Sequence, residues 1–168
     1  MLNVLMDNGY DTLAVGKIKD IFAGSGISEF VYTAGNSEGM ERTLEYAGRD
    51  FNGLCFVNLV DYDMLYGHRR DIEGYAAALK AFDDWLPGFM EALGEEDLLM
   101  ITADHGCDPG FTKSTDHTRE YVPLIISGPA LKGRTFNLGT RSSFADIAAT
   151  VLKYFGLASN IAGQAVEL

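Results

Sequence analysis

The sequence predicts an α/β fold with a largely parallel sheet and helices on both faces. Short apolar runs typical of buried strands alternate along the chain with longer stretches whose apolar residues recur at helical spacing. Strands that alternate with helices usually build a parallel sheet that the helices cover. Nineteen glycines supply turn positions between these elements.

Four runs have the length and apolar character of buried parallel strands. Each is followed by a turn or by polar residues, and we expect all of them in the sheet. They are Thr12–Val15, Leu54–Val60, Leu98–Thr102 and Pro123–Ser127.

Three stretches are predicted to be helices, namely Ser37–Tyr46, Asp71–Leu93 and Phe144–Tyr154. In the second stretch the apolar side chains are spaced to form one stripe, which we expect to face the core. The third opens with Ser143-x-x-Asp146, which resembles a capping box, and it stops at Gly156.

Composition excludes several kinds of partner. The 168 residues fit a single domain and carry 13 Lys+Arg against 24 Asp+Glu, a net charge of −11. A surface this acidic repels phosphate backbones, so no nucleic-acid partner is expected. No apolar run is long enough to span a bilayer, so no membrane partner is expected either. Two cysteines are too few for a disulfide framework and indicate a cytoplasmic protein.

Acidic and histidine side chains follow two of the predicted strands and precede the last one. In α/β sheets, ligands bind beyond the carboxyl ends of the strands. The chain has three histidines, and each lies within five residues of an aspartate. Imidazole and carboxylate together are ligands for divalent zinc, manganese or iron. The candidate ligands are Asp63, His68, Asp104, His105 and His117.

Five candidate ligands favour two metal ions over one. A catalytic zinc site uses about three protein ligands, and two ions a few ångströms apart suit phosphoryl transfer. Asp104 and His105 are adjacent, so the chain must turn sharply if both bind metal, and Gly106 would ease that turn. The alternative is that these histidines are ordinary surface or core residues.

For several other polar residues near these positions, the sequence leaves two possible roles open. Asp61 forms a D-x-D pair with Asp63, and it either binds metal or hydrogen-bonds a loop. Lys17 follows Gly16 at a strand end without the spacing or hydroxyl of a P-loop, so it is either a phosphate contact or a surface lysine. Three arginines either bind phosphate or pair with the acids beside them, Asp71 and Glu120; they are Arg69, Arg70 and Arg119.

Taken together, three runs resemble the phosphopentomutase family of the alkaline phosphatase superfamily. Asp-His-Gly at 104–106 by itself indicates only the superfamily. The run that ends in Tyr-Gly-His-Arg-Arg-Asp at 66–71, followed by Thr-Asp-His-Thr-Arg-Glu at 115–120, is far more specific. The resemblance extends over the whole chain.

The resemblance implies an alkaline-phosphatase-like core and an enzyme that interconverts ribose or deoxyribose 1-phosphate with the 5-phosphate through a phospho-enzyme. It implies two divalent metal ions, usually manganese. One ion would be held by Asp63, His68 and His117. The other would be held by Asp104 and His105 with further ligands, and Lys17 would contact the substrate phosphate.

Phosphopentomutases are more than twice as long as this chain. The resemblance therefore implies that residues 1–168 are the C-terminal portion of the catalytic core, without the N-terminal strand, the nucleophilic threonine and the cap domain. No catalytic nucleophile is expected in this chain. The alternatives are a metal-binding truncated or split fragment without activity alone, or a related metal-dependent phosphatase or cofactor-independent phosphoglycerate mutase. A sheet edge exposed by missing strands would favour a homodimer or pairing with another fragment.

Overall fold

The computed structural model describes residues 1–158 and 160–168. Its elements in chain order are α1 (Leu2–Asp7), β1 (Asp11–Val15), α2 (Ile18–Ile21), β2 (Glu29–Val31), α3 (Asn36–Ala47), β3 (Gly53–Val57), the π-helix η1 (Tyr62–Gly67), α4 (Ile72–Glu91), β4 (Leu99–Thr102), β5 (Leu124–Ser127), the 3₁₀-helix η2 (Pro129–Leu131) and α5 (Ala145–Tyr154). The α/β fold expected from the sequence is confirmed.

A three-stranded parallel sheet in the order β2-β1-β3 forms the first half of the structure. In its register, Leu13 of β1 lies opposite Glu29 of β2 and Cys55 of β3. Residues 12–15 of β1 are almost completely buried, because β1 has a strand on each side and helices above and below. That position explains why the run is continuously apolar.

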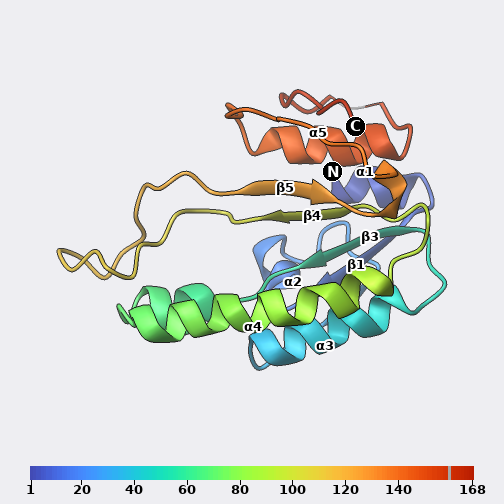
Figure 1. Cartoon of the computed structure of the whole chain (residues 1–168). Coiled ribbons are helices and arrows are strands. Elements are labelled where there is room, and N and C mark those ends of the chain that lie inside the picture. Colours follow the sequence, from blue (N-terminus) through green and yellow to red (C-terminus); the bar gives the residue numbers. More distant parts are fainter. Residues whose placement is uncertain (159) are drawn as a thin grey trace.

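The last two strands form a separate antiparallel pair, in which Leu99 lies opposite Ser127. The expectation that these two runs are parallel strands was wrong. The connection over residues 103–123 contains no helix to carry the chain across the sheet, so the chain folds back and β5 runs against β4. Figure 1 shows this connection as a long loop that extends beyond the sheets. Strand β2 was not predicted, because three residues are too few to show a pattern.

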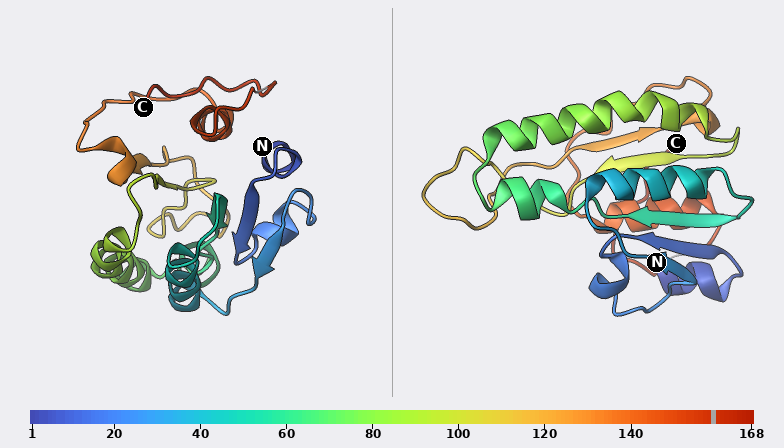
Figure 2. Two further views of the ribbon diagram at one scale, coloured as in Figure 1. Left: turned by 90° about the vertical axis from the view of Figure 1, so that its right-hand side faces the viewer. Right: turned by 90° about the horizontal axis from the view of Figure 1, so that it is seen from below.

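Helices cover both faces of the sheets, as the sequence predicts. Figures 1 and 2 show α3 and α4 side by side on one face and α1 with α5 on the other. Buried Leu5, Val151 and Leu152 form a cluster on the α1 and α5 side. Leu54 of β3 and Met100 of β4 both pack against this cluster, so the two sheets share one core.

Helix α4 agrees with its predicted range but not with its predicted burial. Asp71 caps it by accepting a hydrogen bond from the Gly74 amide at 2.9 Å. The apolar stripe was expected in the core, yet Ile72 and Leu79 are 58% and 51% exposed and Phe89 is buried. The N-terminal half of α4 extends past the sheets (Figure 1), so only its C-terminal half reaches the core.

The predicted capping box at the start of α5 does not form. The Ser143 hydroxyl oxygen accepts from the Ala145 amide, but the Asp146 carboxylate turns inward. There it accepts from the Gln164 amide and from Arg141 Nε, both at 2.8 Å. Asp146 therefore holds the C-terminal segment against α5 instead of capping the helix. In the part of the chain that the structure describes, no helix has the length and apolar character required to cross a bilayer.

Candidate metal centre

Two candidate ligands lie on one π-helical segment directly after β3. Asp63 is in η1 and His68 ends it, with the His68 amide donating to the Asp63 carbonyl at 3.0 Å. This i to i+5 hydrogen bond places the two side chains one turn apart. Single π-turns are rare and are frequently found at functional sites. The local backbone thus brings a carboxylate and an imidazole to the carboxyl end of the parallel sheet.

The long loop after β4 contributes a third ligand, His117. Asp63 Oδ1 lies 3.2 Å from His68 Nε2 and 3.4 Å from His117 Nε2. One ligand atom from each of the three residues lies within 4.8 Å of the others. Ligand atoms about 2.1 Å from a tetrahedral ion are separated by about 3.4 Å, so the three atoms fit around one divalent ion.

Hydrogen bonding around the triad supports this fit. His68 Nδ1 bonds the Thr115 carbonyl oxygen, which can only accept, so Nδ1 carries the proton. When His68 is neutral, its Nε2 lone pair faces Asp63 Oδ1 at 3.2 Å, a buried oxygen with no hydrogen-bond partner in the described structure. Two acceptor atoms that face each other are stabilised by a cation between them. A backbone carbonyl that fixes the tautomer of a ligating histidine is a common feature of metal sites.

The other two candidate ligands lie beside the triad. The His105 ring stacks on the His117 ring with centroids 3.7 Å apart, and His105 Nε2 is 3.8 Å from Asp104 Oδ1. The Asp104 side chain is 75% exposed. His105 therefore borders the triad through its ring contact with His117, and the structure brings neither Asp104 nor His105 into the three-atom cluster.

Gly106 serves a purpose different from the sharp turn expected of it. It pairs with Thr118 in an isolated antiparallel bridge, and its φ is not positive. A Cβ at this position would come within 2.7 Å of the Glu120 amide nitrogen. Glycine is required here because the returning strand of the loop passes this close, and that approach brings His117 beside His105.

Lys17 reaches the edge of the same site from β1. Gly16 has a φ of 77°, and a Cβ there would lie 2.4 Å from the Asn58 carbonyl oxygen, so only glycine allows β1 and β3 to end this close together. The exposed Lys17 side chain then extends across to η1, where Nζ lies 2.7 Å from Met64 Sδ. Its ammonium group therefore lies next to the residue that follows Asp63.

Asp61 hydrogen-bonds a loop, which is one of the two roles that the sequence left open for it. Its Oδ2 accepts from the Asn36 amide at 2.7 Å, and its own amide donates to Asn36 Oδ1 at 2.9 Å. These reciprocal bonds join the end of β3 to the start of α3. The carboxylate is therefore engaged with the backbone and lies outside the ligand triad.

Tyrosine and cysteine side chains pack around η1. The Tyr62 and Tyr75 rings lie 5.7 Å apart, and a Cβ on Gly67 would lie 2.5 Å from Cys107 Sγ. Burial raises the pKa of Tyr62 to about 12 and also raises the pKa values of Tyr75 and Cys107. The raised pKa favours the thiol form of Cys107, which is a poor metal ligand.

Arg70 has a role that neither predicted alternative included. Its guanidinium donates to backbone carbonyl oxygens of the loop, at Asp108, Ser114 and Asp116. Among the described residues it forms no ion pair with Asp71, and its guanidinium N–H groups are engaged with main-chain oxygens. Sequence spacing gives no signal for such a contact, because the acceptors are main-chain atoms some forty residues away.

Comparison with known proteins gives consistent matches. The chain is 62% identical over 164 residues to a phosphopentomutase of Lachnoclostridium phytofermentans and 57% identical to that of Acetivibrio thermocellus. Each alignment covers 98% of this chain and 42% of the relative, so the chain spans less than half the length of these relatives.

A solved structure supports the fold, and a family model identifies the superfamily. A phosphoglycerate mutase of Leishmania mexicana superposes with a TM-score of 0.74 over 94% of this chain and 37% of its own, at 20% identity, which supports the fold alone. The model of the metalloenzyme superfamily matches residues 5–159. This chain, whose Asp63, His68 and His117 could together hold a metal ion, belongs to the metalloenzyme superfamily.

Proposed function

We propose that this chain is the C-terminal portion of a phosphopentomutase core, which interconverts ribose or deoxyribose 1-phosphate with the corresponding 5-phosphate. The observation that carries the proposal is the convergence of Asp63, His68 and His117 on one point. Identities of 62% and 57% to phosphopentomutases favour this member of the superfamily.

Each residue of the site has a role in this proposal. Asp63, His68 and His117 hold one divalent ion, and Asp104 with His105 contribute to a second. We propose manganese for these ions, because the resemblance to phosphopentomutases implies it and carboxylate oxygens suit it. When bound, the two ions would offset phosphate charge and hold the attacking and leaving oxygens of a phosphoryl transfer.

Charge explains why an acidic chain needs these ions. A net charge of −11 repels a sugar phosphate, and two divalent ions would add +4 where the substrate must approach. Lys17 extends positive charge along the same edge, since its ammonium group reaches Met64 beside the triad. We assign Lys17 to the substrate phosphate as a point charge, a role that lysine commonly takes.

The reaction is a phosphoryl exchange with no net change in composition. A phospho-enzyme donates its phosphoryl group to the free hydroxyl of the pentose monophosphate, which gives a bisphosphate. The enzyme then recovers a phosphoryl group from the other end of the sugar. In this proposal the nucleophile comes from the part of the protein that corresponds to the remaining length of the relatives, and residues 1–168 supply metal ligands and Lys17.

The proposed compartment and partners follow from the same residues. Cys55 and Cys107 are both free, which favours a reducing cytoplasm. A small sugar phosphate is the proposed ligand, with neither nucleic acid nor membrane as a partner. Strands β2, β3, β4 and β5 each have one neighbour in the described sheets, and we propose that the chain on its own pairs with a second copy through an edge strand.

The test joins this chain to the N-terminal part of the Lachnoclostridium phytofermentans relative. We expect the manganese-loaded hybrid to form ribose 5-phosphate from ribose 1-phosphate and to leave 3-phosphoglycerate unchanged. The chain alone should bind metal without turnover. A metal-loaded hybrid that converts phosphoglycerate, or that acts on neither compound, would rule out the assignment.

A further inference from the structure

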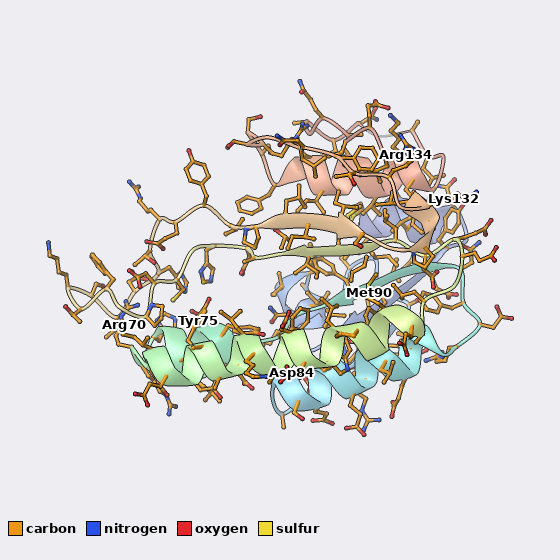
Figure 3. All side chains as sticks on the ribbon, in the orientation of Figure 1. Arg70, Tyr75, Asp84, Met90, Lys132 and Arg134 are labelled. Atoms are coloured by element: carbon orange, nitrogen blue, oxygen red, sulfur yellow. The ribbon has the colours of Figure 1, made fainter. Side chains whose placement is uncertain are left out.

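Arg70 links the two segments that carry the metal-binding triad. It follows η1 by three residues, and Figure 3 shows it at the start of α4, where the distal part of the long loop comes close. Its Nε and Nη1 donate to the Ser114 and Asp108 carbonyl oxygens, both at 2.9 Å. Nη2 donates to Ser114 and, at 2.6 Å, to Asp116. One side chain thus fixes the loop immediately before His117.

The planar guanidinium makes this arrangement possible. Arginine carries five N–H donors in a fixed fork, and four hydrogen bonds here reach three carbonyl groups. Lysine has a single compact ammonium group on a flexible stem and cannot span the same set of acceptors. The contact therefore depends on shape as well as on charge.

The backbone of Arg70 is itself in an unfavourable conformation. Its φ is 57°, in the left-handed region that side chains other than glycine rarely adopt. Such residues persist where the surrounding structure determines their conformation, and they cluster at functional sites. The Arg70 amide also closes η1 by donating to the Gly67 carbonyl at 3.1 Å. Main chain and side chain together connect η1 to the His117 loop.

We infer that Arg70 is a positioning residue for the metal centre, which holds His117 at the distance from Asp63 and His68 that one divalent ion requires. The inference rests on the proposed function, since it presupposes a metal at the triad. In the described structure no hydrogen bond or ion pair joins Arg70 to a ligand atom of the triad, so its effect passes through the carbonyls of the loop. Removing an outer contact of this kind typically lowers metal affinity 10- to 100-fold.

Electrostatics alone predicts the opposite direction. Removing a positive charge near a divalent cation reduces repulsion and should strengthen metal binding. A loss of metal affinity in an Arg70 variant would therefore indicate that His117 is no longer held in position. Arg69 provides the matched control, because it is the adjacent, exposed arginine and the structure shows no such fork from it to the loop.

The experiment titrates the 168-residue chain and its variants with Co²⁺ and follows the visible absorption of the bound ion. Arg70→Gly removes the side chain while relieving the left-handed strain, and Arg70→Lys keeps a positive charge. We expect Co²⁺ affinity to fall about 10-fold or more in Arg70→Gly and by a smaller factor in Arg70→Lys. Arg69→Gly should bind as tightly as the unaltered chain or more tightly.

Chemical rescue separates positioning from a general loss of structure. Millimolar guanidinium should restore Co²⁺ affinity and the absorption spectrum of Arg70→Gly, whereas equal ammonium should not. Unchanged affinity in Arg70→Gly, or equal effects of the two cations, would overturn the inference. If the unaltered chain shows no bound Co²⁺ spectrum, the proposed metal site fails first, and the inference fails with it.

Discussion

Two aspartates separated by one residue have different roles in this site. Asp61 accepts from the backbone amide at the start of α3, whereas Asp63 directs a buried oxygen with no hydrogen-bond partner in the described structure toward two imidazoles. The sequence predicts both as candidate polar groups at a strand end. It leaves their roles open, because the distinction depends on which way η1 turns after β3.

This difference gives a paired prediction. Asp63→Asn removes a ligand charge and should lower divalent-metal affinity by at least about 100-fold, more than the loss of an outer contact. Asp61→Ala removes a helix-start acceptor and should lower the free energy of unfolding by about 1 kcal/mol. Titration calorimetry and urea unfolding measure the two effects.

The two effects should separate cleanly between the variants. Asp61→Ala should keep the metal affinity of the unaltered chain, and Asp63→Asn should unfold at nearly the same urea concentration as the metal-free chain. Equal loss of metal binding in both variants would mean that Asp61 is also a ligand.

At the scale of elements, Asp146 shows how a sequence motif can form a different contact. The S-x-x-D pattern predicts a capping box, but the carboxylate instead accepts from Gln164 and Arg141. The hydrogen bond from the Gln164 amide is the main reason that the pKa of Asp146 is lowered, and Arg141 lowers it further. The local pattern could not reveal this, because the partner amide lies 18 residues away.

The lowered pKa predicts a pH dependence of stability. A carboxylate whose pKa is lower in the folded chain stabilises the fold above its unfolded pKa, near 3.8, and loses that effect as pH falls through the folded pKa. Asp146→Asn should therefore lower the free energy of unfolding at pH 7. The difference from the unaltered chain should narrow below about pH 4.

Urea unfolding at a series of pH values measures this difference. Asp84→Asn is the control, because Asp84 forms an exposed pair with Lys80 and should contribute less than about 1 kcal/mol. A gap between the unaltered chain and Asp146→Asn that stays constant from pH 7 to pH 3 would contradict the role of the carboxylate.

The other elements show where sequence patterns succeed. The ranges of α3, α4 and α5 match their apolar periodicity to within two residues, because a long helix repeats its signal over several turns. Strand β2 and helix η1 were not anticipated, since both are short and depend on tertiary contacts. The direction of β5 was wrong because strand composition does not encode which neighbour a strand pairs with.

At the scale of the molecule, two sheets share a core without pairing with each other. Leu54 of β3 and Met100 of β4 contact the same buried cluster, yet the strand pairs given by the described residues are β2-β1-β3 and β4-β5. The sequence predicts the α/β class correctly. The sequence cannot predict that the strands divide into two sheets, because an apolar run at the edge of a sheet has the same composition as one in its centre.

The edge strands of the two sheets predict self-association. Strands with unpaired amide and carbonyl groups tend to pair with another chain. We expect light scattering to show a dimer whose population rises with salt, because two copies that each carry a charge of −11 repel at low ionic strength. Replacing Phe56 of β3 by proline should weaken the dimer, since proline disrupts strand pairing. A strict monomer at every salt concentration would contradict this prediction.

The central claim is that this chain holds a divalent ion at Asp63, His68 and His117, and titration with Mn²⁺ followed by electron paramagnetic resonance tests it most directly. The signal of free Mn²⁺ should stay absent during the titration until one equivalent of Mn²⁺ per chain has been added, because the first ion is bound tightly. A second ion, at Asp104 and His105, should bind more weakly, and Asp63→Asn should abolish the tight phase. A free-ion signal that persists from the first addition, or two equally tight ions, would contradict the account.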